Sequence, residues 1–281
     1  MILIAILVGT LAAGIGSVWL AALLSFGVLA RYTQHMLSLA AGALLATAFM
    51  HLLPEAFESQ AGAKELFATL LVGLVFFFLL DKAELWHHGH EHHDGEHHDG
   101  EHHEPAQPAH GAHAHHHHRH DHHHPPAGGK KSGGWAVLAG DSVHAFGDGI
   151  LIASAFMADL RLGAVAALAV LVHEVPHHMG DLVVLRQSSN NNRRAAVVKV
   201  SLAGAVTALG GMIGYALVDR LYDYLPFFLI AASSSFIYVA LADLIPQLQK
   251  RVTAKETAAQ IVWLVIGIGM VTLISGLAHG H

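Results

Sequence analysis

The sequence predicts an all-α integral membrane protein with about eight transmembrane helices. Of its 281 residues, 53% are hydrophobic and only 13% are charged, and the mean hydropathy is +0.46. A soluble domain of this size would carry about a quarter charged residues. Apolar runs of about 20 residues, the length a helix needs to cross a bilayer core, recur along the whole chain.

Polar breaks divide these runs into eight expected spans. They are 3–29, 36–57, 66–86, 135–158, 162–185, 195–218, 225–248 and 258–279. The first run has no basic flank and is too long for a cleaved signal peptide, so we expect a retained span. The long break at 87–134 separates three spans in 1–86 from five in 135–281, and together they form one membrane domain.

Lysine and arginine predict the orientation. With the N-terminus outside, inward-facing segments hold 12 of the 15 basic residues and outward-facing segments hold three. Cytoplasmic loops are enriched in these residues. We therefore expect a multi-pass protein of the plasma (inner) membrane, with both termini extracytoplasmic and 87–134 in the cytosol.

The long break is a histidine-rich segment. Residues 87–124 contain 19 of the 27 histidines, interleaved with acidic residues and almost no apolar ones, which predicts a disordered loop. Neutral imidazole is a good ligand for Zn, Cu, Ni and Fe. We expect weak, exchangeable metal binding here. A solvated linker or a purification tag is the alternative, and the interior position and acidic repeats argue against a tag.

The fourth and fifth expected spans carry eight ionisable side chains near mid-membrane. They are Asp141, His144, Asp148, His173, Glu174, His177, His178 and Asp181. Offsets of three and four residues place members of each set on common helix faces. A lone histidine in a span is more often a hydrogen-bonded contact between helices. So many costly groups on two consecutive spans instead indicate a functional site.

The donor atoms indicate a divalent transition metal. The chain has no cysteine, so thiolate ligands are excluded. Two carboxylates among imidazoles would neutralise a divalent cation and suit Zn²⁺ or Fe²⁺ better than Mg²⁺ or Ca²⁺. We expect Zn²⁺ as the bound substrate, with Fe²⁺, Mn²⁺ or Cd²⁺ left open. Pro176 lies among these residues, and a broken turn at this depth is tolerated where it lines a site.

The end of the second span adds His51 and Glu55, four residues apart with Pro54 between them. We expect them to admit the ion or to act as auxiliary ligands, and a capped helix end is the alternative. Asp243 and Pro246 end the seventh span in a similar way. Because the two spans cross in opposite directions, the echo fits an inverted repeat. Two helices that end at a proline by chance would look the same.

Two motifs now carry a resemblance. His144-Ala145-Phe146-Gly147-Asp148-Gly149 and His173-Glu174-Val175-Pro176-His177-His178 resemble the fourth- and fifth-span motifs of the ZIP (Zrt/Irt-like) metal transporters, of the bacterial type. Those motifs read roughly His-Asn-x-x-Asp-Gly and His-Glu-x-Pro-His-Glu. The resemblance covers the whole chain, including the eight spans and the histidine-rich loop. It implies a ZIP-like helix bundle, a homodimer, and metal movement into the cytosol by an elevator-like shift.

The resemblance also implies roles for residues. The first metal position would use His144, Asp148, His173 and His177, with His51 as a contributor. A second position would use Glu174 and share Asp148 and His177 with the first. Ala145 and His178 depart from the family's Asn and Glu. Whether the site holds one or two metal ions therefore stays open.

Two other functions compete with metal uptake. His173-Glu174-x-x-His177 matches the HExxH signature of zinc proteases, although Pro176 interrupts it and the fourth span adds a His/Asp pair that a protease does not need. A metal efflux carrier would also use intramembrane His and Asp, but typically with six spans and a soluble domain. We expect a carrier and not an enzyme, with the lipid bilayer around it and no nucleic-acid partner.

Overall fold

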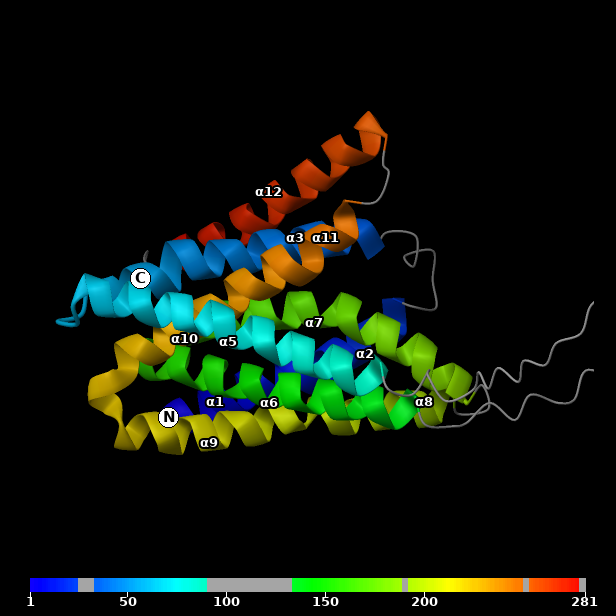
Figure 1. The fold of residues 1–281 in the computed structure, drawn as a ribbon, viewed down its shortest axis with the longest axis horizontal. Coiled ribbons are helices and arrows are strands. Elements are labelled where there is room, and N and C mark those ends of the chain that lie inside the picture. The colour runs from blue at the N-terminus through cyan, green and yellow to red at the C-terminus, as the bar shows by residue number, and fades with distance from the viewer. Residues whose placement is uncertain (25–32, 90–132, 189–191, 250–252, 278–281) are drawn as a thin grey trace, which may run out of the picture.

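The computed structural model describes residues 1–24, 33–89, 133–188, 192–249 and 253–277 (Figure 1). Within these ranges every regular element is helical and there is no strand, so the all-α prediction is confirmed. The predicted disordered loop falls almost wholly on 90–132, outside the described residues.

The described helices follow one another along the chain, with residues 90–132 between α5 and α6. They are α1 (Ile2–Leu11), η1 (Ala12–Gly16), α2 (Ser17–Leu24), α3 (Thr33–Thr47), η3 (Ala48–Leu52), α4 (Leu53–Phe57), α5 (Ala63–Gly89), α6 (Gly133–Ala158), α7 (Leu160–Ser188), α8 (Arg193–Gly204), α9 (Val206–Arg220), η5 (Tyr222–Tyr224), α10 (Leu225–Tyr238), η6 (Val239–Leu244), α11 (Ile245–Leu248) and α12 (Ala254–Leu277). Helix α5 continues three residues beyond its expected end at 86, and α6 begins two residues before 135.

Seven continuous helical segments in the described part are long and apolar enough to cross a membrane. They correspond to all the expected spans except the fourth, and they identify a multi-pass membrane protein. Helix α6 is not in this group, although it has 26 residues, and it carries Asp141, His144 and Asp148. An eighth span at α6 therefore rests on its length and its place among the other helices (Figure 1).

Two segments widen into π-helix just before a proline. In η3 and η6 the π turns lead directly into α4 and α11, whose first turns contain Pro54 and Pro246. A proline has no N–H to donate to the preceding turn, and its ring crowds that turn's carbonyl. A π turn relieves this conflict without ending the helix. Pro176 behaves differently, since α7 remains α-helical through it.

A close seam between α6 and α9 fixes the position of α6. A Cβ atom on Gly149 would lie 2.1 Å from the carbonyl oxygen of Thr207, and one on Gly210 would lie 2.1 Å from that of Phe146. Only glycine allows two helix backbones to come this close. Helices α7 and α1 pack beside this pair, and α2 packs against α7. Helix α3 pairs with α12, and α5 pairs with α10.

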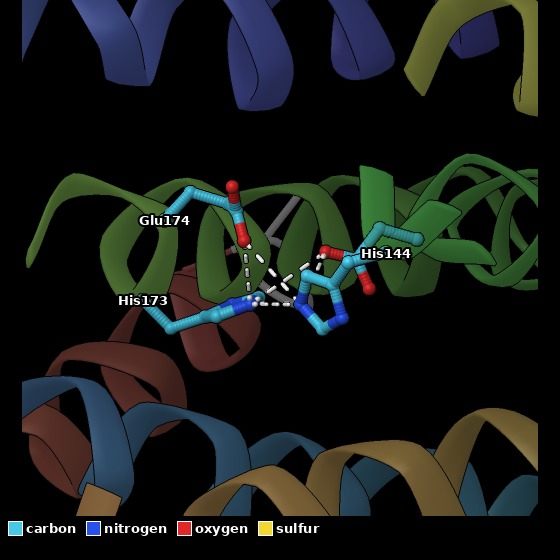
Figure 2. A group of neighbouring side chains, drawn as sticks. His144, His173 and Glu174 are labelled. Carbon is cyan, nitrogen blue, oxygen red and sulfur yellow. Dashed lines mark hydrogen bonds and ion pairs between the residues drawn. The ribbon is translucent and has the colours of Figure 1, made fainter. Parts of the chain in front are cut away.

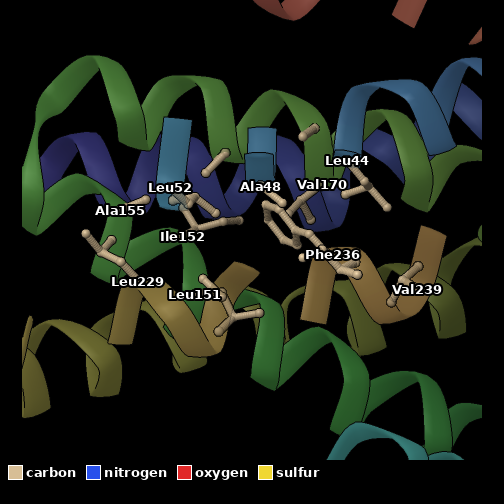
Figure 3. Packing of buried hydrophobic residues seen from close by; sticks show 14 of the residues in the cluster. Leu44, Ala48, Leu52, Leu151, Ile152, Ala155, Val170, Leu229, Phe236 and Val239 are labelled. Atoms are coloured by element: carbon tan, nitrogen blue, oxygen red, sulfur yellow. The ribbon is translucent and has the colours of Figure 1, made fainter. Parts of the chain in front are cut away.

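The apolar core joins these two sets of helices. One cluster of buried side chains draws members from five helical segments (Figure 3). They include Leu44 of α3, Leu52 of η3, Ile152 of α6, Val170 of α7 and Phe236 of α10. By contrast, only 6% of the most apolar stretch of α5 and 11% of that of α12 are buried. The core thus holds α6 and α7 in the interior, while α5 and α12 present apolar side chains outward, as lipid-facing helices do.

Candidate metal site

Four side chains of α6 and α7 converge on one point, and we call them the first cluster: His144, Asp148, His173 and Glu174. Figure 2 labels three of them, His144, His173 and Glu174. His173 Nε2 lies 3.0 Å from Glu174 Oε1 and 3.6 Å from Asp148 Oδ2. His144 Nε2 lies 3.5 Å from Glu174 Oε1 and 3.8 Å from Asp148 Oδ2. The two Nε2 atoms are 3.5 Å apart.

These separations match a tetrahedral zinc site. Ligand atoms about 2.05 Å from a tetrahedral ion are about 3.3 Å from one another. The five measured separations, from 3.0 to 3.8 Å, bracket that value. Two imidazole nitrogens and two carboxylate oxygens are also a donor set that Zn²⁺ accepts. The first cluster therefore fits one divalent ion without rearrangement of the helices.

Burial favours a bound cation in this cluster. Asp148, His173 and Glu174 are 3%, 1% and 2% exposed. Asp148 Oδ2 and Glu174 Oε1 are buried and accept no hydrogen bond from the described residues. A buried carboxylate oxygen without a partner is costly. A divalent ion among the four ligand atoms would remove that cost for both oxygens at once.

Local helix geometry explains how each ligand is aimed. His144 and Asp148 are four residues apart and share one face of α6, whereas His173 and Glu174 are neighbours on α7. His173 Nδ1 lies 3.4 Å from the carbonyl oxygen of Ala169. An Nδ1–H that donates there leaves the lone pair of Nε2 facing the cluster, the arrangement usual for metal-binding histidines.

His177 lies at the rim of the cluster and outside the ligand group. Its ring stacks on that of His144, with centroids 5.8 Å apart, but its Nε2 lies 3.4 Å from Asp243 Oδ2 on η6. The side chains of His177 and Asp243 are 42% and 40% exposed. The family resemblance implies His177 as a ligand of the first metal position, and this assignment stays a prediction. In the structure its contact with Asp243 connects α7 to η6.

Asp243 is a functional candidate that the sequence analysis did not assign to the site. Its only signal was the echo between the ends of the second and seventh spans. His178 also faces away from the first cluster and toward Asp141 and the second oxygen of Glu174. Asp141 was recognised as an ionisable residue of the fourth span, but its partner could not be read from spacing alone.

His51 and Glu55 do not join the first cluster. His51 belongs to η3, and its Nδ1 lies 3.5 Å from the Ser275 hydroxyl of α12. Glu55 is exposed on α4. Because the π turn of η3 changes the helical phase, the four-residue spacing no longer holds the two side chains in one column.

Comparison with known proteins gives a consistent result. The sequence model of a family described as "ZIP Zinc transporter" matches residues 1–275. The "Zinc transporter ZIP13 homolog" of Drosophila melanogaster is 31% identical over 154 residues, which are 53% of this chain and 42% of that protein. The "Zinc transporter zipt-7.2" of Caenorhabditis elegans is 34% identical over 150 residues, 49% of this chain and 30% of that protein.

A third relative has the same character. The "Zinc transporter ZIP10" of Danio rerio is 32% identical over 149 residues, or 50% of this chain and 17% of that protein. The matched regions thus make up less than half of each of these longer relatives. All three are animal proteins, so the bacterial type expected from the sequence stays a prediction.

Proposed function

Because the chain belongs to the family of ZIP zinc transporters, we propose that it carries a divalent transition metal, chiefly Zn²⁺, through the first cluster. The observation that carries this proposal is the convergence of two buried carboxylates and two imidazoles at tetrahedral spacing between two helices of the interior. The family consists of transporters and not enzymes. Fe²⁺, Mn²⁺ and Cd²⁺ are competing substrates of the same donor set.

The proposed direction is into the cytosol. With both termini outside a plasma membrane, the ends of α5 and α7 and the start of α6 face inward. Moving two positive charges through about 100 mV, negative inside, releases roughly 4.6 kcal/mol. That free energy suffices for uptake without ATP. The proposed assembly is a homodimer, and the exposed apolar faces of α5 and α12 offer surfaces for lipid and for a second copy.

The proposed path begins at the outward end of α3 and α4, where His51 and Glu55 admit the ion. It binds in the first cluster and leaves past the pair of His177 and Asp243 at the rim. The histidine-rich segment then receives it. In this scheme His177 binds the ion after it leaves the first cluster. His177 thus keeps a role in metal handling but is not a ligand of the first cluster.

The protease alternative finds no support in the geometry. An HExxH protease needs both histidines on one ion with the glutamate beside them. Here His177 Nε2 faces Asp243, while Glu174 Oε1 faces the same point as His173. Efflux differs from uptake only in the direction of flow, and transport measurements separate the two.

The direct test is ⁶⁵Zn²⁺ uptake into proteoliposomes of known protein orientation. Asp148→Asn keeps the shape of the side chain but removes the charge that balances the ion. Because even the partners that support metal ligands contribute about tenfold or more to affinity or activity, we expect uptake to fall by at least about tenfold. Asp219→Asn is the matched control. Asp219 is exposed at the end of α9, so this variant should transport normally.

Unchanged uptake by Asp148→Asn would contradict the site, and outward flow in both proteins would contradict the direction. Competition by Fe²⁺, Mn²⁺ and Cd²⁺ in the same vesicles ranks the substrates.

The histidine-rich segment calls for a separate measurement. Deletion of 90–124 should leave the initial rate of uptake within about twofold, because the segment supplies exchangeable sites and no part of the first cluster. The number of Zn²⁺ ions retained by the purified protein should fall. Complete loss of uptake in a correctly inserted deletion variant would contradict this division of roles.

A further inference from the structure

A second group of ligand atoms lies beside the first and shares one residue with it. We propose that Asp141, Glu174 and His178, the second cluster, form a distinct divalent-metal site that takes the ion from the first cluster through Glu174. This inference rests on the proposed transport function. It differs from the second position implied by family resemblance, which would use Asp148 and His177.

The two clusters divide the carboxylate of Glu174 between them. Its Oε1 faces His144 and His173, whereas its Oε2 lies 3.1 Å from His178 Nε2. The same His178 Nε2 lies 3.6 Å from Asp141 Oδ1. These separations are again close to the roughly 3.3 Å expected between ligands of one tetrahedral ion. Glu174 is thus placed to hold an ion on either side.

A serine determines which nitrogen of His178 carries the hydrogen. Ser17 Oγ donates to the carbonyl oxygen of Gly14 at 2.7 Å, and it lies 3.0 Å from His178 Nδ1. A hydroxyl has only one hydrogen to donate. Ser17 must therefore accept a hydrogen bond from Nδ1–H, which leaves Nε2 of the neutral imidazole with a bare lone pair.

That lone pair points at two carboxylate oxygens. His178 is 0% exposed, and its Nε2 has no hydrogen-bond partner among the described residues. The two oxygens are Glu174 Oε2 and Asp141 Oδ1, and the other oxygen of Asp141, Oδ2, is buried and accepts no hydrogen bond from the described residues. Three acceptors that face one another repel unless a cation lies between them. A divalent ion bound by one nitrogen and two oxygens satisfies all three.

A further carboxylate lies next to this group. Asp181, which follows His178 on α7, is close enough to interact electrostatically with Asp141 and His178, and its Oδ2 accepts no hydrogen bond from the described residues. Asp141, Glu174 and Asp181 together concentrate negative charge in a buried region. This favours a divalent over a monovalent ion.

The position of the second cluster fits a relay toward one end of the bundle. Asp141 precedes His144 by three residues on α6, and His178 follows Glu174 by four on α7. Both offsets place the second cluster nearer the start of α6 and the end of α7. Residues 90–132 immediately precede α6 in the chain. Because two divalent ions on one carboxylate repel each other, an arriving second ion would favour release of the first.

The first experiment locates the metal in crystals of the full chain that contain Cd²⁺, by anomalous scattering. We expect one peak within the first cluster and a second between Asp141, Glu174 and His178. In His178→Ala the second peak should disappear and the first should remain. A single peak in the first cluster of the unaltered protein would overturn the second site and leave the proposed function intact. Absence of both peaks would overturn both.

Transport kinetics provide a test in solution that preserves the ligands. Ser17→Ala removes the acceptor that orients His178, and loss of such a partner typically costs about tenfold or more in metal affinity or activity. We expect the maximal rate of Zn²⁺ uptake to fall by about tenfold with little change in KM, since the first cluster is untouched. Ser17→Thr, which keeps the hydroxyl, should restore the rate.

Ser154→Ala is the matched control. Ser154 is also fully buried, but its hydroxyl donates only to the carbonyl oxygen of Ile150 in its own helix. It should transport at the unaltered rate. Equal losses in Ser17→Ala and Ser154→Ala, or no recovery in Ser17→Thr, would reduce Ser17 to a structural role and overturn the proposal.

Discussion

The ends of the second and seventh spans are built alike but are used differently. Each passes from α-helix into a π turn and then into a short helix that begins at a proline, Pro54 in one and Pro246 in the other. Asp243 in η6 contacts His177 at the rim of the first cluster, whereas His51 in η3 lies beside Ser275 of α12. The shared backbone form follows from proline, while the role of each polar residue follows from the helix that it meets.

The largest effect should come from Asp243. Asp243→Ala removes the carboxylate 3.4 Å from His177 Nε2 and leaves that imidazole without its acceptor. We expect Zn²⁺ uptake to fall by about tenfold, as for other groups that orient a metal-handling histidine. Initial rates in proteoliposomes measure this, with the exposed Asp219→Asn again as the control. A normal rate would remove the functional difference between the two ends.

A smaller effect should follow from the proline that shapes η6. In Pro246→Ala a backbone N–H becomes available to the carbonyl of Ala242, which favours closure of the π turn into α-helix and rotates Asp243 away from His177. We expect a loss of about threefold, equivalent to a barrier about 0.7 kcal/mol higher. Pro54→Ala is the paired comparison in the same assay. A larger loss in Pro54→Ala than in Pro246→Ala would reverse the assignment of roles.

The smallest effect should come from His51. His51→Ala leaves both clusters intact and affects only the admission of the ion, so we expect KM to rise by about twofold, under 0.5 kcal/mol, with an unchanged maximal rate. Saturation curves for uptake separate the two parameters. A tenfold fall in maximal rate would place His51 in the central site, the contribution that the family resemblance implies.

The sequence predicted the membrane helices, and it predicted that His144 and Asp148 would share one face of a helix. Apolar runs predict membrane helices because their length is fixed by the bilayer. Asp148 and His144 share a face because four residues are about one turn. The ionisable residues of the fourth and fifth spans, which lie on α6 and α7, are the feature that predicts a site there.

The relative positions of different helices could not be read in this way. His173 and His177 are also about one turn apart, yet only His173 enters the first cluster, because η6 brings Asp243 next to His177. Ser17 has no local signal at all. It contacts His178 across 161 positions of sequence, and that contact exists only because η1 and α2 pack against α7.

The seam of Gly149 and Gly210 has a consequence for ion discrimination. Gly149 adjoins the ligand Asp148, and the backbone of α9 bears directly on its other side. A methyl group there would force α6 away from α9 and so disturb the position of Asp148 beside α7. The space for the proposed ion is therefore set partly by Gly149 of α6 and Gly210 of α9, two residues that have no side chain.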